Sequence, residues 1–328
     1  MRIGITLGDV NGIGPEVAVK ALQRGGLPAD TACVLIGPRR VLDEQGAAFG
    51  LPAPPCIPCG SEPAPGETRI WDTGEVLPWL PGRVRADAAR AAVNAVRTGV
   101  RACLEGRLDA LVTAPLCKEG LQLAQLDYPG HTELLAEECG VTRFGMLLMG
   151  GGLRVLLATR HLPLRLVADA LTPDVLRMAL ALGVEALPWL GCADRVIGVC
   201  GLNPHAGDGG ILGDEERDIL EPVLQEARQR GWPVVGPVPA DVIFHQALQG
   251  RYGIVLALYH DQGLGPLKMH AFATGVNVTL GLPMVRTSPD HGTAFDIAGK
   301  NRADPSSMGA ALQAACDLAQ RPNPWRRA

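Results

Sequence analysis

Three of the seven histidines come directly or shortly after apolar runs that are typical of buried strands. His161 ends LRVLLATRH, His260 follows YGIVLALY, and His205 lies in a glycine-rich loop after RVIGVC. Parallel α/β sheets collect ligands at the carboxyl ends of their strands, and three imidazoles with an open position describe a catalytic metal site. The sequence separations match no local metal motif, so each histidine could instead cap a helix or fill a core.

Composition indicates a globular protein of two domains. A chain of 328 residues with 47% hydrophobic and 20% charged residues suits that size. No apolar run is long enough to span a membrane, and the first residues lack a secretory signal pattern. A net charge of −4 and 4% aromatic residues argue against a nucleic-acid surface. Only four of the 30 cationic residues are lysines, and Lys268 follows His260 by eight residues.

The nine cysteines are scattered, which predicts reduced thiols and a cytoplasmic protein rather than a disulfide framework. Cys56 and Cys59 form a C-x-x-C pair inside a proline-rich connection, with no second pair for zinc. A redox motif should instead open a helix after a strand. We therefore interpret the pair as structural.

Alternating strand and helix patterns predict an α/β fold with a mainly parallel sheet and helices on its faces. Strands are expected at 1–7, 31–37, 109–115, 144–149, 153–159, 195–200 and 253–259. Helices are expected at 15–24, 86–106, 131–140, 172–189, 214–230, 241–249 and 304–320, the last with Asp304 as N-cap and Pro305 at N1. Residues 50–83 should form a surface excursion, and the glycines behind His260 should leave room for a ligand.

The first glycine-rich segment, GDVNGIGPE at 8–16, fits the dinucleotide-binding Rossmann fingerprint poorly, because Pro15 and Glu16 begin the helix. A dinucleotide would need loops of another kind.

The chain resembles the 4-hydroxythreonine-4-phosphate dehydrogenase family. The resemblance rests on GDVNGIGPE (8–16), TAPLCKEGL (113–121), GHTELLAE (130–137), RHLPL (160–164), GLNPHAGDGG (201–210), YHDQGLGPLK (259–268) and GVNVTLGLPMVRTSPDHGTAFDIAG (275–299). The segment 291–305 is also similar to the cofactor loop of isocitrate and isopropylmalate dehydrogenases. This implies a two-domain fold of that kind, with a cleft between an outer domain (about 1–125 with 255–328) and a middle, dimer-forming domain (about 126–254).

The resemblance also implies roles for particular residues. His161, His205 and His260 would bind one divalent metal, for which three histidines favour zinc, with magnesium or cobalt as alternatives. The substrate contacts would be His131, Thr132, Lys268, Asn277 and Arg286. The NAD or NADP contacts would be His291, Gly292, Thr293, Ala294 and Asp296. Lys268 would transfer a proton, and Asp261 would orient the His260 ring.

The implied reaction is a metal-dependent oxidation of 4-phosphooxy-L-threonine with decarboxylation to 3-amino-2-oxopropyl phosphate, in pyridoxal 5'-phosphate biosynthesis. The implied assembly is a homodimer whose site takes His161 from one chain and the other two histidines from its partner.

Alternatives remain open within and beyond the family. The chain departs from the family pattern at Val10, Cys117, Asp208 and Ile211. Of these, Cys117 and Ile211 leave D-threonate or D-erythronate 4-phosphate as alternative substrates. A phosphate acyltransferase, a metal-dependent hydrolase and a small-molecule binding protein are the readings from other classes.

Overall fold

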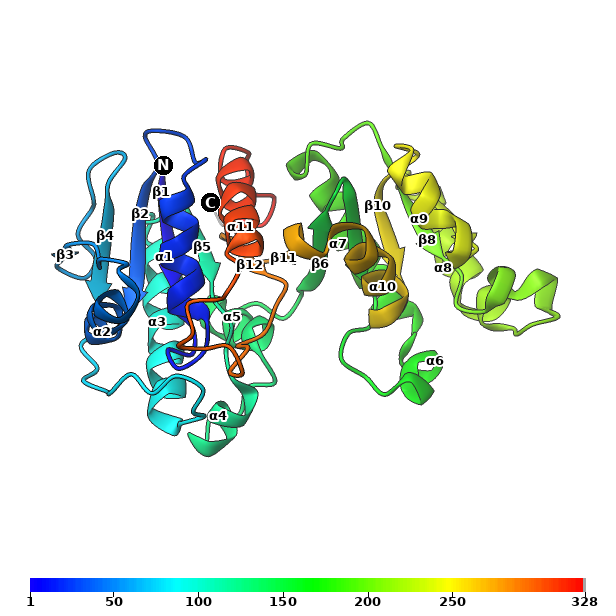
Figure 1. Ribbon diagram of the computed structural model, residues 1–328. Coiled ribbons are helices and arrows are strands. Elements are labelled where there is room, and N and C mark those ends of the chain that lie inside the picture. The colour runs from blue at the N-terminus through cyan, green and yellow to red at the C-terminus, as the bar shows by residue number, and fades with distance from the viewer. Residues whose placement is uncertain (327–328) are drawn as a thin grey trace. The chain divides into compact units, whose positions relative to one another are not determined.

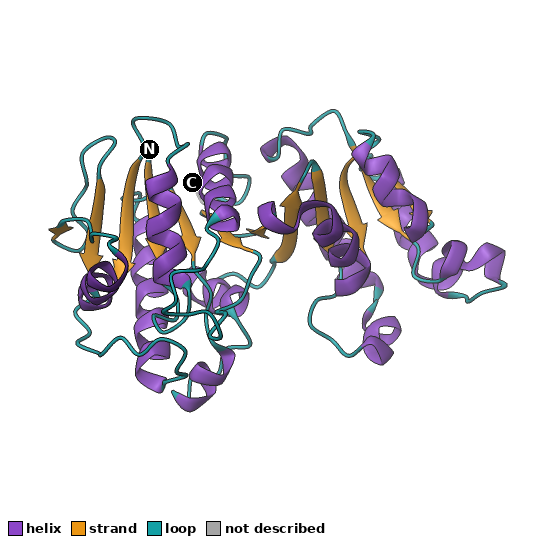
Figure 2. Ribbon diagram, viewed as in Figure 1, coloured by secondary structure: helices purple, strands orange, loops and turns teal. Residues whose placement is uncertain are grey.

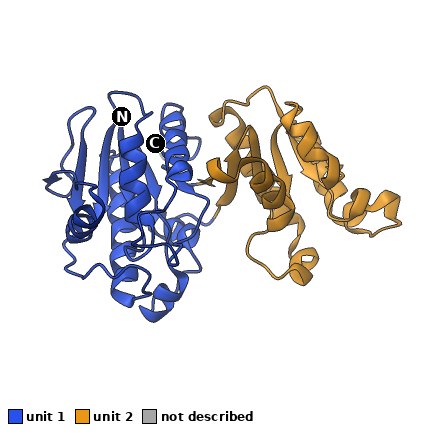
Figure 3. Ribbon diagram, in the orientation of Figure 1, with its two compact units in different colours: residues 1–142, 282–328 blue, residues 143–281 orange. Residues whose placement is uncertain are grey.

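The computed structural model describes residues 1–326 and divides into two compact units, Met1–Thr142 with Leu282–Ala328 and Arg143–Gly281 (Figures 1 and 3). The first unit is discontinuous in the sequence. The boundaries expected near 125 and 254 fall elsewhere, because helix α5 packs on α3 of the first unit and strand β10 pairs with β7 and β8 of the second. Both units are α/β, which confirms the predicted fold class (Figure 2).

Unit 1 is built on parallel strands in the order β3-β4-β2-β1-β5-β12. These strands are Arg2–Thr6 (β1), Ala32–Gly37 (β2), Cys56–Ile57 (β3), Thr68–Asp72 (β4), Ala110–Thr113 (β5) and Val285–Pro289 (β12). The helices are Gly14–Arg24 (α1), Arg39–Phe49 (α2), Ala86–Leu104 (α3), Lys118–Leu123 (α4), His131–Cys139 (α5) and Ser306–Ala319 (α11). Helix α1 lies beside Leu35 of β2, whereas α3 packs on Val34 and Ile36, so the two helices cover opposite faces.

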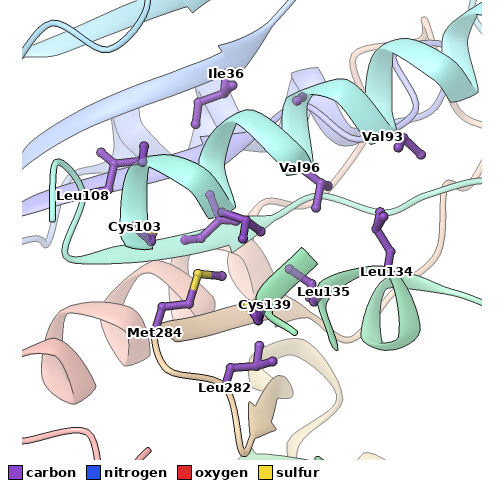
Figure 4. Packing of buried hydrophobic residues seen from close by; sticks show 14 of the residues in the cluster. Ile36, Val93, Val96, Cys103, Leu108, Leu134, Leu135, Cys139, Leu282 and Met284 are labelled. Carbon is purple, nitrogen blue, oxygen red and sulfur yellow. The ribbon is translucent and has the colours of Figure 1, made fainter. Parts of the chain in front are cut away.

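The core of unit 1 gathers around α3 (Figure 4). Alanines at many of its buried positions favour the helix and keep its inner face narrow. A Cβ at Gly99 would lie 2.4 Å from Leu111 Cδ1, so glycine there permits close packing on β5. Val93, Val96 and Leu134 are each no more than 2% exposed, and each such side chain contributes about 1.5–3 kcal/mol through burial.

Unit 2 has the strand order β11-β6-β7-β10-β8-β9, in which β7, β10, β8 and β9 are parallel and β6 is antiparallel to both neighbours. The strands are Gly145–Gly150 (β6), Leu153–Leu157 (β7), Val196–Cys200 (β8), Val234–Val238 (β9), Tyr252–Ala257 (β10) and Val276–Leu280 (β11). The α-helices are Val167–Ala170 (α6), Pro173–Trp189 (α7), Glu221–Gln229 (α8), Ala240–Leu248 (α9) and His260–Ala271 (α10). Short helical turns occupy Leu164–Leu166 (η1), Pro204–Gly210 (η2), Glu216–Leu220 (η3) and Phe272–Thr274 (η4).

Three expectations about local structure were wrong. The segment 50–83 is not only a surface excursion, since β4 pairs with β2 and buries Ile70 and Trp71. Helix α11 begins at Ser306 with Pro305 as its N-cap residue, one position later than expected. The glycines behind His260 belong to α10, where a Cβ at Gly263 would lie 2.6 Å from Val155 Cγ1. Gly263 therefore leaves room for the sheet rather than for a ligand, whereas a Cβ at Gly265 would meet no atom within 4 Å, so the expectation fails at Gly263 only.

Candidate active site

The three histidines of unit 2 follow neighbouring parallel strands. His161 comes after β7, His260 begins α10 after β10, and His205 comes after β8. Because β10 pairs in parallel with both β7 and β8, all three strand ends lie at one edge of the sheet. The rings of His161 and His260 are adjacent, with centroids 5.4 Å apart at an interplanar angle of 45°. The sequence alone does not show which two of the three histidines lie close together.

His205 is placed differently from the other two histidines. Its turn, η2, contacts β9, α9 and η3. From His205 to Gly209 every φ angle is positive, which is a strained conformation for the non-glycine residues among them. Within residues 1–326 no group of three or more His, Cys, Asp or Glu side chains could hold a metal ion. The single chain therefore brings together two of the three expected ligands.

This placement bears on the expected division of ligands between subunits, which remains a prediction. That division put His161 and His260 on different chains, but their rings are neighbours within one chain. His260 Nδ1 lies 2.7 Å from Asp261 Oδ1, so the carboxylate orients the ring and leaves Nε2 for a ligand. Two neighbouring imidazoles, one of them supported by a carboxylate, are chemically suited to a divalent metal.

Lys268 and Asn277 also belong to unit 2. Lys268 lies in the last turns of α10, the helix that His260 begins. Asn277 lies in β11 opposite Leu148. Its Oδ1 atom is buried from solvent and has no hydrogen-bond partner. A buried unsatisfied acceptor is costly, and a ligand donor would satisfy it.

The remaining expected substrate residues form a second group, in unit 1. Arg286 in β12 is 1% exposed, and its Nε and Nη2 donate to Thr113 Oγ1 at 3.2 and 2.6 Å. Burial lowers the pKa of Arg286 to about 9, so the guanidinium remains charged at neutral pH. His131 begins α5, with Thr132 next to it. Burial, and then the neighbouring Arg286 charge, hold the pKa of His131 well below its usual range.

The expected cofactor residues lie in the loop that follows β12. Thr293 O accepts a hydrogen bond from Ile13 N at 3.0 Å, and a Cβ at Gly12 would lie 2.8 Å from the same oxygen. Glycine at position 12 thus permits a close approach of the first loop. Ala294 has a φ of 43°. The Nε2 atom of His291 is buried from solvent and has no hydrogen-bond partner. Gly292 and Asp296 occupy the same loop.

Helix α1 holds the far end of this loop. Glu16 is 1% exposed, and its Oε1 accepts from Ala303 N at 2.8 Å and from Lys20 Nζ at 2.6 Å. Lys20 also donates to the carbonyl groups of Asn301 and Ala303. The segment GDVNGIGPE therefore positions residues 293–303 from both ends, although it lacks the Rossmann pattern.

Asp9 is a buried carboxylic acid of this segment that was not among the expected site residues. The available signal was a carboxylate inside a glycine-rich loop directly after a strand. Cys117, one of the departures from the family pattern, is buried and accepts from Gly120 N through Sγ at 3.3 Å as the N-cap of α4. Ile211, another departure, is 80% exposed.

Fold and side chains together give an α/β protein in which two neighbouring imidazoles follow parallel strands and a buried guanidinium lies within another parallel strand. The chain belongs to the family described as pyridoxal phosphate biosynthetic protein PdxA, which matches residues 30–315. This confirms the resemblance drawn from the motifs.

Named relatives cover nearly the whole chain. Over 328 residues it is 40% identical to the D-threonate 4-phosphate dehydrogenase of Cupriavidus necator, with 97% of each chain covered. It is 42% identical over 325 residues to the 4-hydroxythreonine-4-phosphate dehydrogenase of Ruegeria sp., with 98% of each covered. The crystal structure of the Klebsiella pneumoniae 4-hydroxythreonine-4-phosphate dehydrogenase matches with a TM-score of 0.87, at 39% identity over 98% of both chains. Among the described residues, no helix is both long and apolar enough to cross a membrane.

Proposed function

We propose that this protein is a metal-dependent, NAD- or NADP-linked dehydrogenase that oxidises 4-phosphooxy-L-threonine and decarboxylates the product to 3-amino-2-oxopropyl phosphate. The pair of neighbouring imidazoles, His161 and His260, on a chain of this family carries the proposal. In pyridoxal 5'-phosphate biosynthesis this reaction yields an amino-ketone phosphate. The free thiols at all nine cysteines fit a reducing compartment, and we place the enzyme in the cytoplasm.

The residues proposed to bind the substrate are Arg286, His131, Thr132, Lys268 and Asn277. A buried guanidinium can hold an anionic oxygen pair with its planar fork, and a lysine adds a point charge. His131 is neutral, so it can donate or accept a hydrogen bond without adding charge. Lys268 is our candidate for moving the proton of the substrate hydroxyl.

The proposed metal ligands are His161 and His260 of one chain, with zinc favoured and magnesium or cobalt as alternatives. A divalent cation bound there would supply a Lewis acid that favours loss of the hydroxyl proton. A bound NAD or NADP would supply the hydride acceptor for the oxidation, and the 3-oxo acid so formed would release CO2 and take up a proton. We assign the loop residues His291, Gly292, Thr293, Ala294 and Asp296 to the nicotinamide cofactor.

A second copy of the chain is proposed to complete the metal site. Large apolar side chains are exposed after His161, beside His205 and on the last turns of α10; they are Leu162, Leu164, Leu166, Ile211, Leu212, Met269 and Phe272. Exposed apolar residues on three segments that flank the histidines suit a subunit interface. In this homodimer the partner subunit's His205 would be the third ligand, because η2 contacts β9 and α9 within its own chain.

D-threonate 4-phosphate is the second candidate substrate, favoured by the 40% identity to the Cupriavidus necator enzyme. It carries a hydroxyl where the first candidate carries an ammonium group. The test follows the absorbance of the reduced nicotinamide with 4-phosphooxy-L-threonine, D-threonate 4-phosphate and D-erythronate 4-phosphate, each with NAD and with NADP. The highest kcat/KM with 4-phosphooxy-L-threonine is expected. Turnover of none of the three would overturn the proposed function.

A further inference from the structure

Asp9 is a buried carboxylic acid that none of the proposed roles uses. It lies in the loop after β1 and is 0% exposed. Its Oδ1 accepts a hydrogen bond from Asn11 N at 3.0 Å, whereas its Oδ2 is inaccessible to solvent and has no hydrogen-bond partner. Burial, and to a smaller degree the nearby Asp87 carboxylate, raises the pKa of Asp9 to about 6. The group is therefore mainly ionised at neutral pH, with one oxygen unsatisfied.

Asp9 shares its surroundings with the candidate substrate residues of unit 1. Three consecutive residues at the end of β5 each contact one of them. Thr113 Oγ1 accepts from Arg286, the Ala114 backbone hydrogen-bonds to His131, and Pro115 O accepts from Asp9 N at 2.8 Å. Segment 113–115 thus contacts the Arg286 side chain, the His131 side chain and the backbone of Asp9 at the carboxyl end of one strand.

Other unsatisfied groups lie at the same edge of the sheet. Thr6 pairs in register with Thr113, and its Oγ1 is buried without a partner. His131 Nε2 is likewise inaccessible and unpartnered. Leaving buried polar atoms unpaired is costly, and native proteins do so at sites where a ligand supplies the missing partner.

We infer that Asp9 belongs to the ligand-binding site and that its Oδ2 accepts a hydrogen bond from an N–H or O–H group of a bound molecule. The inference rests on the proposed function for its choice of ligands. Two molecules offer such a donor, namely the substrate, through its ammonium or hydroxyl group, and the nicotinamide cofactor, through its carboxamide. The positive charge of Arg286 and the negative charge of Asp9 would then hold opposite ends of a ligand with both charges.

The test compares Asp9→Asn with the parent protein by calorimetric titration and by steady-state kinetics. Asparagine keeps an acceptor for Asn11 N–H but presents an NH2 group where Oδ2 stood, so a ligand donor would face a donor. The ligands are NAD, 4-phosphooxy-L-threonine, D-threonate 4-phosphate and inorganic phosphate. We expect the Kd and KM to rise about 10- to 100-fold for the ligands that carry the donor, with the others nearly unchanged.

Each pattern identifies the source of the donor. A loss for 4-phosphooxy-L-threonine that spares D-threonate 4-phosphate assigns Oδ2 to the ammonium group, and an equal loss for both assigns it to a hydroxyl group. A loss for NAD alone assigns it to the carboxamide. Unchanged affinity for all of them overturns the inference. Failure of the proposed function can be told apart from failure of this inference. In the first case the parent protein would turn over none of the substrates, and the NAD titration would still measure the effect of Asp9→Asn.

Two further variants test whether a loss of affinity in Asp9→Asn comes from a general change in structure. Thr31→Val removes another buried hydroxyl, at the amino end of β2 and thus at the opposite edge of the sheet. It should leave every Kd unchanged. Asp9→Ser, which keeps a small acceptor, replaces Asp9→Asn if that variant does not fold, and it should weaken the same ligand. Equal losses in Asp9→Asn and Thr31→Val would contradict a role in binding.

Discussion

The guanidinium of Arg286 donates through both Nε and Nη2 to the hydroxyl of Thr113, although the two residues are 173 positions apart. The contact joins two neighbouring parallel strands, β5 and β12, and is buried. A hydroxyl that accepts two bonds from one guanidinium fixes its plane. The orientation of the candidate anion-binding group is therefore set by the sheet itself.

Thr113→Val should lower the affinity for the phosphorylated substrate about tenfold and destabilise unit 1 by on the order of 1–3 kcal/mol, because the buried guanidinium loses the acceptor of its Nε and Nη2 bonds. Arg286→Lys, which keeps the charge but loses the planar fork, should lower substrate affinity further while NAD affinity stays nearly unchanged. Calorimetric titration of each ligand measures both effects.

The neighbouring residue on β12 provides the matched control. Thr287 is also buried, but it donates to Ala311 O on α11, on the other face of the strand. Thr287→Val should cost similar stability and leave substrate affinity unchanged. A collapse of NAD affinity in Arg286→Lys, with substrate affinity intact, would assign Arg286 to the other ligand.

The proposed metal ligands can be tested through the hydrogen bond between His260 and Asp261. Asp261→Asn should weaken metal binding about 10- to 100-fold, since the carboxylate orients the ring and raises its basicity. The readout is titration of the metal-free protein with Zn²⁺ or Co²⁺, together with activity after chelation. Asp241→Asn, at the start of α9, is the control and should bind metal normally. Full turnover with no bound metal would contradict the metal role.

Subunit exchange distinguishes the revised ligand division from the one expected from the sequence. If His161 and His260 act from one chain with the partner's His205, then His205→Ala and His260→Ala homodimers should be inactive but regain activity when mixed. Their heterodimer holds one complete site and one site that lacks both ligands. Mixing His161→Ala with His260→Ala should restore nothing, since each site keeps one defect. Mass spectrometry confirms exchange, and the reverse pattern would restore the original division.

Asp9→Asn should also change how stability depends on pH. The folded protein raises the pKa of this carboxyl group from 3.8 to about 6, so between those values it retains a proton that the unfolded chain has lost. Stability contributed by the protonated acid is present near pH 4 and is lost as pH rises through about 6. The cost at pH 8 is on the order of 3 kcal/mol.

Thermal unfolding of the parent protein and of Asp9→Asn at pH 4.5 and pH 8 measures this cost. The variant should gain stability relative to the parent as pH rises, because the amide does not ionise. A difference that is independent of pH would show that Asp9 titrates normally. Asp87 and Cys117 also face Asp9, so Asp87→Asn serves to separate its smaller electrostatic contribution.

The buried pair of Glu16 and Lys20 should control cofactor affinity through the loop that it holds. Glu16→Gln keeps an acceptor for Ala303 N but loses the ion pair, and Lys20→Met loses the bonds to two loop carbonyl groups. Both should raise KM for NAD several-fold and leave substrate affinity nearly unchanged. Arg24→Met removes an exposed ion pair between the same helix and Asp304, and it should have no effect. An equal loss in all three variants would indicate general destabilisation.

The sequence by itself determined the local features of this protein. Apolar runs marked β8 and β10 within two residues, and periodicity with small side chains marked α3 and α7 equally well. Strand ends that carry His161, His205 and His260 were visible for the same reason, because side-chain periodicity is a local property. The missed elements include helices α2, α4, α6 and α10 and strands β4, β9 and β12, since elements that are short or contain or adjoin proline or glycine depend on the surfaces against which they pack.

Only the tertiary structure decided which of these residues meet. Strand order placed β10 between β7 and β8, and this makes His161 and His260 neighbours across 99 residues while His205 lies over β9 and α9. Burial made Arg286 an internal cation rather than a surface ion pair, and left one oxygen of Asp9 unsatisfied. Strand pairing and burial depend on contacts between distant parts of the chain, and the local pattern of residues does not encode which strands become neighbours.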